Sequence, residues 1–179
     1  MRKLVVAGLA IAAVGLMTAS TASAGLPKPK DTKRIDVPES IAGVELGMKI
    51  KRADRSWGNR GNCDFKGRQD CRYVGRNPRA GSAVIEAAKR GKVSSFGIFA
   101  GLDGDHYTFR GKLLRFHAKR GIGLGDKGAK VRRAFPKAIR TANDTGWIVE
   151  GKGRSYMTFQ TLGGKRITGI TVVDGDEQG

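Results

Sequence analysis

The sequence contains few of the residue types that build most catalytic and metal sites. It has two histidines, His106 and His117, and two cysteines, Cys63 and Cys71, in 179 residues. Neither histidine accompanies a nucleophile motif such as G-x-S-x-G. A metal site on the cysteines would need further ligands, and the histidines stand singly, far along the chain. The sequence therefore predicts no catalytic residues and no metal site.

One glycine pattern is typical of dinucleotide-binding proteins but lacks the context that such a site needs. Residues 123–128 read G-L-G-D-K-G and satisfy G-x-G-x-x-G. In a dinucleotide site this loop leads into a long helix within a parallel βαβ unit. Here Pro136 ends the helical pattern early, and Asp126 would repel a pyrophosphate. We therefore expect no cofactor.

Carboxylates are scarce relative to cations. Lys and Arg number 34 against 16 Asp and Glu, which gives a formal net charge of +18. Such a charge keeps a protein soluble and attracts polyanions. No nucleic-acid-binding motif accompanies it, and aromatic residues make up only 7% of the chain. We expect either a purely solubilising surface or one that binds an envelope protein or an anionic cell-wall polymer. The predicted binding residues are Arg68, Arg72, Arg76 and Arg79.

The one long apolar run lies at the N-terminus. Arg2 and Lys3 precede an uncharged run from Leu4 to Met17, and small residues follow as far as Ala22-Ser23-Ala24. This is the pattern of a signal peptide cleaved after Ala24, so the protein is predicted to be secreted or extracytoplasmic. An uncleaved membrane anchor is the alternative, because the uncharged stretch is long enough to span a bilayer.

The predicted export determines the oxidation state expected of the cysteines. Cys63 and Cys71 are the only two, and a protein in an oxidising compartment is expected to pair them in a disulfide. The loop between them is short, so the bond is predicted to pin a hairpin.

Fifteen residues of the chain occur twice, 78 positions apart. Residues 93–101 likewise match residues 167–175 at an offset of 74, so the chain reads as two copies of one module. Identical pairs in the longer match are Gly43/Gly121, Leu46/Leu124, Gly47/Gly125, Lys49/Lys127 and Arg55/Arg133. The predicted organisation is a signal peptide (1–24), a basic linker (25–40), a disulfide-bearing first unit (41–101), a connection (102–118), a second unit (119–175) and a tail (176–179).

Each copy begins with a helical pattern. Ile50, Ala53 and Trp57 have helical spacing, and Val131 and Phe135 are their counterparts. Each helix is predicted to be about ten residues long, too short to be stable alone, so its apolar side must pack on something else. In the second copy Asp126 is the expected N-cap. Gly58 and Pro136 stop the two helices at equivalent positions.

Alternating segments after each helix predict antiparallel strands. In the second copy residues 155–162 and 166–173 alternate, with a bulge expected at Gly169 because Ile167 and Ile170 are out of phase. In the first copy residues 71–74, 82–88 and 92–99 have the same roles. The predicted fold is therefore α+β, with two tandem units that each pack a short helix on an antiparallel β-meander.

Several of these residues resemble a known family. The run Gly43-x-x-Leu46-Gly47-Met48, a helix ending at Trp57-Gly58, and the pair Asn62-Cys63 and Cys71-Arg72 resemble the first half of the secreted β-lactamase inhibitory proteins. That family has two tandem units, each a helical segment on a four-stranded sheet, with a disulfide after the first helix. The module also resembles the small lipoprotein of the outer-membrane assembly machinery, which implies the same layout.

The inhibitory residues of that family do not carry over. The inhibitors block an enzyme active site with an acidic residue on the hairpin beyond the second cysteine. In this chain the same hairpin contains Arg76 and Arg79 and has no carboxylate between residues 73 and 81. The sequence thus favours an exported, non-enzymatic binding module. The alternatives are an enzyme inhibitor of the β-lactamase inhibitory type, and a secreted hydrolase with an unrecognised site at His106 or His117.

Overall fold

The computed structural model describes residues 25–30, 32–162 and 165–175. The predicted signal peptide (1–24) and tail (176–179) lie outside the described residues. The fold is mixed α+β and consists mostly of strands, which confirms the predicted class at that level. Within the described part of the chain, no helix has the length and apolar character needed to cross a bilayer.

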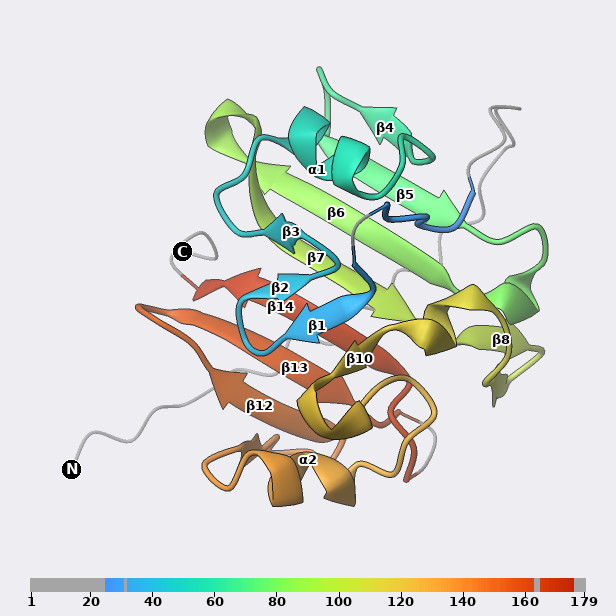
Figure 1. Cartoon of the computed structure of the whole chain (residues 1–179), viewed down its shortest axis with the longest axis vertical. Coiled ribbons are helices and arrows are strands. Elements are labelled where there is room, and N and C mark those ends of the chain that lie inside the picture. Colours follow the sequence, from blue (N-terminus) through green and yellow to red (C-terminus); the bar gives the residue numbers. More distant parts are fainter. Residues whose placement is uncertain (1–24, 31, 163–164, 176–179) are drawn as a thin grey trace.

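The centre of the molecule is one continuous eight-stranded antiparallel sheet (Figure 1). The four strands that follow the first helix meet the four that follow the second helix where β7 pairs with β14. The helices therefore share one sheet, whereas the sequence suggested a sheet for each. Its strands, in spatial order, are β11 (Ile139–Arg140), β12 (Gly146–Glu150), β13 (Ser155–Gln160), β14 (Gly169–Asp174), β7 (Lys92–Phe99), β6 (Ser82–Ala88), β5 (Asp70–Val74) and β4 (Asn62–Asp64).

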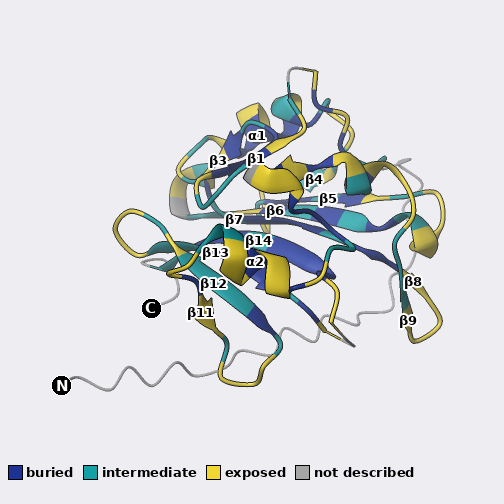
Figure 2. Ribbon diagram, turned by 60° about the horizontal axis from the view of Figure 1, so that its bottom comes forward, coloured by how far each residue is buried: buried dark blue, intermediate teal, exposed yellow. Residues whose placement is uncertain are grey.

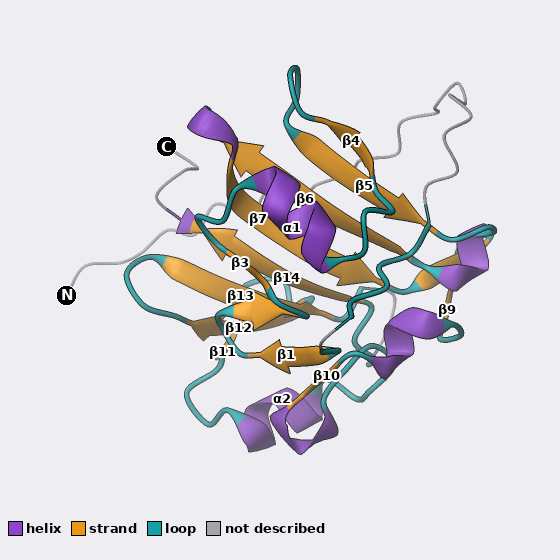
Figure 3. Cartoon of the chain, turned by 45° about the horizontal axis from the view of Figure 1, so that its top comes forward, coloured by secondary structure: helices purple, strands orange, loops and turns teal. Residues whose placement is uncertain are grey.

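The remaining elements are small. Helices α1 (Ile50–Ser56) and α2 (Ala129–Ala134) lie on the same face of the large sheet as a four-stranded sheet (Figures 1 and 3). This small sheet has the order β10 (His117–Ala118), β1 (Arg34–Asp36), β2 (Ser40–Ile41) and β3 (Val44–Glu45). A separate hairpin is formed by β8 (Gly101–Asp103) and β9 (His106–Thr108), and the 3₁₀ turns are η1 (Pro78–Ala80), η2 (Lys89–Gly91), η3 (Lys112–Arg115) and η4 (Lys119–Gly121).

Both helices occur where the apolar spacing predicted them but are shorter than expected. Helix α2 begins only at Ala129, with Gly128 at its N-cap position, so the predicted N-cap at Asp126 is wrong. The Asp126 carboxylate instead accepts the backbone N–H of Gly123 at 2.9 Å and pairs with Lys130. Asp126 therefore closes the turn before the helix rather than the helix itself.

Residues 25–40, predicted to be a basic linker, belong to the fold. Pro27 and Pro29 are buried, and the Lys28 N–H donates to the Trp57 carbonyl at 3.0 Å. Ile35 is 1% exposed in β1, which pairs with β10 from the predicted connection. The stretch shows no apolar periodicity because its buried residues, among them Pro27, Pro29 and Ile35, are unevenly spaced.

The predicted bulge at Gly169 is also wrong. The register of β13 with β14 is unbroken from Ser155 opposite Asp174 to Gln160 opposite Gly169. Ile167 lies before the strand and is buried in the preceding loop, which explains its phase relative to Ile170. A register shift occurs instead in β6, between Glu86 and Ala87.

The two halves make equivalent backbone contacts at the offsets found in the sequence. The Gly47 N–H donates to the Val93 carbonyl and the Gly125 N–H to the Ile167 carbonyl, both at 2.8 Å. Turns with two successive positive φ angles precede both glycines, at residues 42–43 and 120–121. Repeated residues thus occupy repeated local structures.

Trp57 joins the helix to both sheets. Its side chain is fully buried, as the sequence predicted, and its indole Nε1–H donates to the Ile41 carbonyl in β2 at 3.1 Å. The ring also packs edge-on against Tyr73 of β5, with centroids 5.1 Å apart. In the second half Phe135 is half-buried and stacks on Phe159.

We expect Trp57→Phe to lower the free energy of unfolding by about 1–3 kcal/mol, because the buried Ile41 carbonyl loses its donor. Urea denaturation monitored by circular dichroism measures this change. Trp147→Phe is the matched control, since no hydrogen bond of its indole occurs among the described residues. An equal loss in both variants would contradict a specific role for the Trp57 hydrogen bond.

Candidate functional site

The disulfide lies at one edge of the large sheet. Cys63 of β4 and Cys71 of β5 are bonded and stand directly opposite each other in the strand register, which confirms the predicted pairing. The bond fastens the three-residue edge strand to its neighbour. Asp54 lies close to both sulfur atoms. Because the sulfurs are bonded to each other, they do not form a thiolate metal site with it.

The turn between the two cysteines is ordered by one carboxylate. Asp64 accepts the backbone N–H groups of Gly67 at 2.8 Å, Arg68 at 3.0 Å and Lys66 at 3.1 Å. These bonds, chiefly that of Gly67, hold the pKa of Asp64 below its usual range because they favour the charged carboxylate. The carboxylate is therefore part of the turn.

A buried polar pair lies behind the disulfide. Asp54 is 8% exposed, and its Oδ1 accepts the Tyr73 hydroxyl at 2.7 Å and the Gly61 N–H at 3.3 Å. Burial, and then the bond to Asp54, raise the pKa of Tyr73 well above its usual range. Both groups are enclosed between α1 and β5, so they serve the structure.

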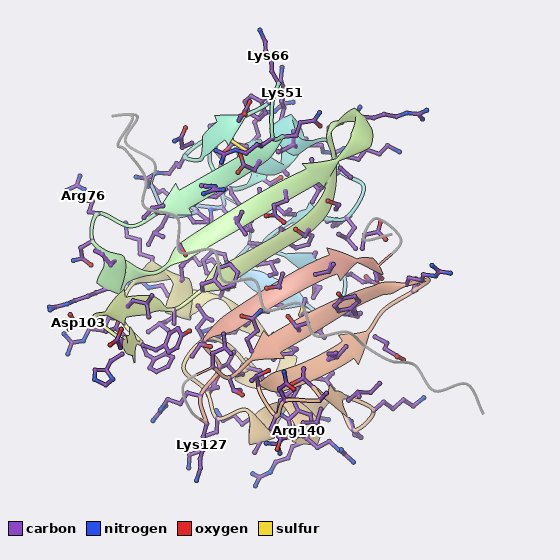
Figure 4. All side chains as sticks on the ribbon, turned by 180° about the vertical axis from the view of Figure 1, so that it is seen from behind. Lys51, Lys66, Arg76, Asp103, Lys127 and Arg140 are labelled. Atoms are coloured by element: carbon purple, nitrogen blue, oxygen red, sulfur yellow. A yellow bond between two sulfur atoms is a disulfide. The ribbon has the colours of Figure 1, made fainter. Side chains whose placement is uncertain are left out.

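The four predicted binding arginines do not gather into one cluster. Arg72 Nε lies 2.9 Å from an Asp70 carboxylate oxygen, and Arg68 Nε lies 3.9 Å from the other. Arg79 pairs with Asp103 of β8 at 2.9 Å. Arg76 is exposed and has no ion pair within the described part of the chain. Lys66, near Arg68, lies well apart from Arg76 in Figure 4.

Neither histidine is part of a catalytic arrangement among the described residues. His106 lies in β9 and His117 in β10, both exposed, and no described hydrogen bond joins either ring to a carboxylate or a hydroxyl. The loop at residues 123–128 leads into the six-residue α2, and the strands that follow are antiparallel.

One face of the large sheet stands out as a candidate surface. Side chains alternate between the faces of a strand. Ile85, Phe96, Ile170 and Val172 are fully buried, and they point into the core beneath the helices. Their neighbours point the other way, where no described helix covers the sheet (Figures 2 and 4). This uncovered face carries Val84, Ser95, Gly97, Phe99, Ile148, Tyr156, Thr158, Thr171 and Val173.

Two glycines shape the middle of the uncovered face. A Cβ atom on Gly169 would lie 2.9 Å from Phe99 Cδ1, and one on Gly97 would lie 3.2 Å from Phe99 Cζ. The Phe99 ring therefore lies flat over both glycines. The neighbouring Thr158 and Thr171 stand opposite each other, and their buried hydroxyl oxygens have no hydrogen-bond partner within the described structure.

Carboxylates lie along one row of the uncovered face. The strand register aligns Asp70, Glu86, Ser95, Val173, Tyr156 and Glu150 across six strands. Three members of this row are acidic in a chain with a formal net charge of +18. Partial burial raises the pKa of Tyr156, which therefore presents a neutral hydroxyl. Sequence reasoning missed this row because its members are brought together only by strand register.

Comparisons with known proteins add little. No protein-family model matches the chain, and no curated protein matches it in sequence. Among solved structures, an extracellular protein containing an SCP domain from Bacillus anthracis aligns with a TM-score of 0.46 and 11% sequence identity. The alignment covers 83% of this chain and 50% of that protein, so this chain spans about half its length.

Removal of the disulfide should destabilise the protein. We expect Cys63→Ser with Cys71→Ser to lower the free energy of unfolding by about 2–4 kcal/mol, because the unfolded chain regains loop entropy. Thermal unfolding of this double variant against wild type measures the loss. Wild type treated with a reductant should match the variant. Two free thiols per native chain would contradict the assignment.

The buried tyrosine predicts a pH dependence at the alkaline end. Since the folded pKa of Tyr73 is raised, its contribution to stability is complete below the unfolded pKa of about 10 and declines as pH rises above it. We expect the unfolding free energy of wild type to fall more steeply above that pH than that of Tyr73→Phe. Urea denaturation at a series of alkaline pH values tests this. Parallel profiles would contradict it.

Proposed function

We propose that this chain is an exported, non-enzymatic binding protein that holds a partner protein on its uncovered sheet face. The observation that carries the proposal is the face itself, an eight-stranded surface free of covering helices among the described elements. Its apolar and aromatic residues are flanked by carboxylates.

The dimensions of the face suit a folded partner. Strands lie about 4.8 Å apart, so eight of them span roughly 35 Å. A standard protein interface needs about 800 Å² on each partner, which is a patch roughly 30 Å across. The face is therefore large enough for such an interface.

The chemistry of the face indicates the character of the partner. Phe99 and Tyr156 are partly exposed on the middle strands of the face, and aromatic residues near the centre of an interface commonly provide most of its binding energy. Glu86 and Glu150 are exposed and lie on either side of them. A partner that presents apolar groups flanked by basic groups would complement this arrangement.

We further propose that the two halves of the sheet are copies of one module. The equivalent turns, backbone hydrogen bonds and strand orders support this origin.

Secretion of the protein is part of the same proposal. The Cys63–Cys71 disulfide supports it, because such bonds persist in oxidising compartments.

A photocrosslinker on each side of the molecule tests the proposed surface. Tyr156→p-benzoylphenylalanine places the probe on the uncovered face, and the same replacement of the exposed Ala129 places it on α2. In the envelope and culture fluid of the producing cells, we expect a defined protein adduct from position 156 only. Excess unlabelled wild type should compete for it, and mass spectrometry should map the crosslink to a site in the partner that is flanked by basic residues.

Charge reversal provides the matched control. Glu86→Lys with Glu150→Lys should compete at least about tenfold less well for the adduct, since it opposes the partner's charge within the interface. Glu39→Lys with Glu45→Lys makes the same charge change on the small-sheet side and should compete as wild type does. Equal competition by both variants, or an adduct from position 129 alone, would contradict the proposed face.

A further inference from the structure

We propose that the opposite side of the molecule, formed by α1, the small sheet and α2, binds a linear phosphate-bearing polyanion. This side is separated from the uncovered face by the core, so the inference does not depend on the proposed partner protein. It assigns a second ligand and a second surface to the same chain.

The exposed charged residues of both helices are all basic. On α1 the one carboxylate, Asp54, is buried against Tyr73, and on α2 there is none. Asp126 lies in the turn before α2, and its carboxylate pairs with Lys130. The exposed cations of the two helices, here called the helix-layer cations, are Lys51, Arg52, Arg55, Lys130, Arg132 and Arg133.

The helix-layer cations repel one another at positions where helix neighbours interact. Lys51 and Arg55 are four residues apart, and Arg52 and Arg55 are three apart. Lys130 and Arg133 repeat the second spacing on α2. Like charges at these spacings destabilise a helix, and helices as short as these have little stability of their own. A bound polyanion would replace this repulsion with attraction at both helices.

The separation of the helices indicates a polymer rather than a single ion. Helix α1 packs on β5, β6 and β7, while Phe135 at the end of α2 stacks on Phe159 of β13. Strands β6 and β13 are three places apart in the sheet, a spacing of about 15 Å, and Figure 1 shows α1 and α2 toward opposite ends of the layer that covers it. One phosphate cannot contact both helices, whereas a chain of phosphates can. Arg120 lies with α2 and donates to the Arg133 carbonyl at 3.1 Å.

Apolar contacts that would favour a lipid surface are sparse on this side. Of the large hydrophobic side chains exposed in the described structure, Phe65 lies beside α1, with Lys51 Nζ 5.5 Å from its ring centre. A hollow beside α1 is lined by charged residues (Glu45, Lys49 and Arg52) as well as by Leu46 and Met48. Interfacial helices instead bury a broad apolar face in the membrane. The surface therefore suits an anionic chain in water.

Long-chain inorganic polyphosphate is the probe for this surface. Fluorescence anisotropy of labelled polyphosphate should show binding that weakens as salt rises. Arg52→Gln with Arg55→Gln, and Arg132→Gln with Arg133→Gln, should each weaken binding about tenfold and reduce the slope of log affinity against log salt by about 1.4, or roughly 0.7 for each lost contact. Glutamine is a good helix former, so both variants should fold. Relief of repulsion should leave their melting temperatures equal to or above that of wild type.

The control variant removes the same charge elsewhere. Lys66→Gln with Arg76→Gln should change polyphosphate affinity less than about threefold, because neither residue lies on the helices. Triphosphate should bind far more weakly than the long chain. An equal loss in the control, no loss in the helix variants, or equal affinity for triphosphate would overturn the proposal. Tighter binding to anionic phospholipid vesicles than to polyphosphate would also overturn it. Unchanged polyphosphate binding by Glu86→Lys with Glu150→Lys distinguishes this surface from the uncovered face.

Discussion

The pairing of β7 with β14 is the contact on which the whole architecture depends. It joins strands that are distant in the chain, with Val173 opposite Ser95 at one end and Gly169 opposite Phe99 at the other. On the core side it aligns Phe96 with Val172 and Ile98 with Ile170, all fully buried. Each half alone contributes one short helix and four strands of the large sheet, a small core for independent stability. Their union gives one core and one broad sheet.

The same pairing separates charge between two sides of the molecule. On the uncovered face it places the carboxylates of the first half in one row with Glu150 of the second. Both helices lie on the other face, and their exposed charged residues are all basic. Several arginines near the disulfide are engaged by Asp70 or Asp103, and such exposed pairs contribute only about 0–1 kcal/mol each. The charge is therefore unevenly distributed, with a row of carboxylates on the uncovered face and basic residues on both helices, although Glu39 and Glu45 are exposed on the small-sheet side.

Local signals in the sequence predicted the parts of the fold that local physics determines. The disulfide was predicted because only two cysteines exist, and Trp57 was assigned to the core from its helical spacing. The linker was misjudged because Ile35 contributes to the core as an isolated residue, without a periodic pattern around it. The start of α2 was also misjudged, since the Asp126 carboxylate accepts the Gly123 N–H in the preceding turn and does not cap the helix.

Which residues lie together on the candidate surfaces depends on strand pairing between distant segments, and the sequence did not predict that pairing. Arg68 and Arg76 looked like neighbours, yet an extended chain advances about 3.3 Å per residue and turns successive side chains to opposite faces. They therefore lie beyond different ends of β5, and Asp70 pairs with Arg68 and with Arg72, which lies between them in the sequence. Conversely, Glu86 and Glu150 are remote in sequence and share a row only through four strand registers.

The two outer strands of the large sheet have a consequence for the behaviour of the protein in concentrated solution. An eight-stranded sheet has two open edges, and an unpaired edge is a template on which another chain can add a strand and start aggregation. Here the edges are β4, with three residues fastened by the disulfide, and β11, with two residues. Each offers too little free backbone for a second molecule to pair with. The molecule can therefore expose a wide sheet face while its edges remain poor seeds for intermolecular β-structure.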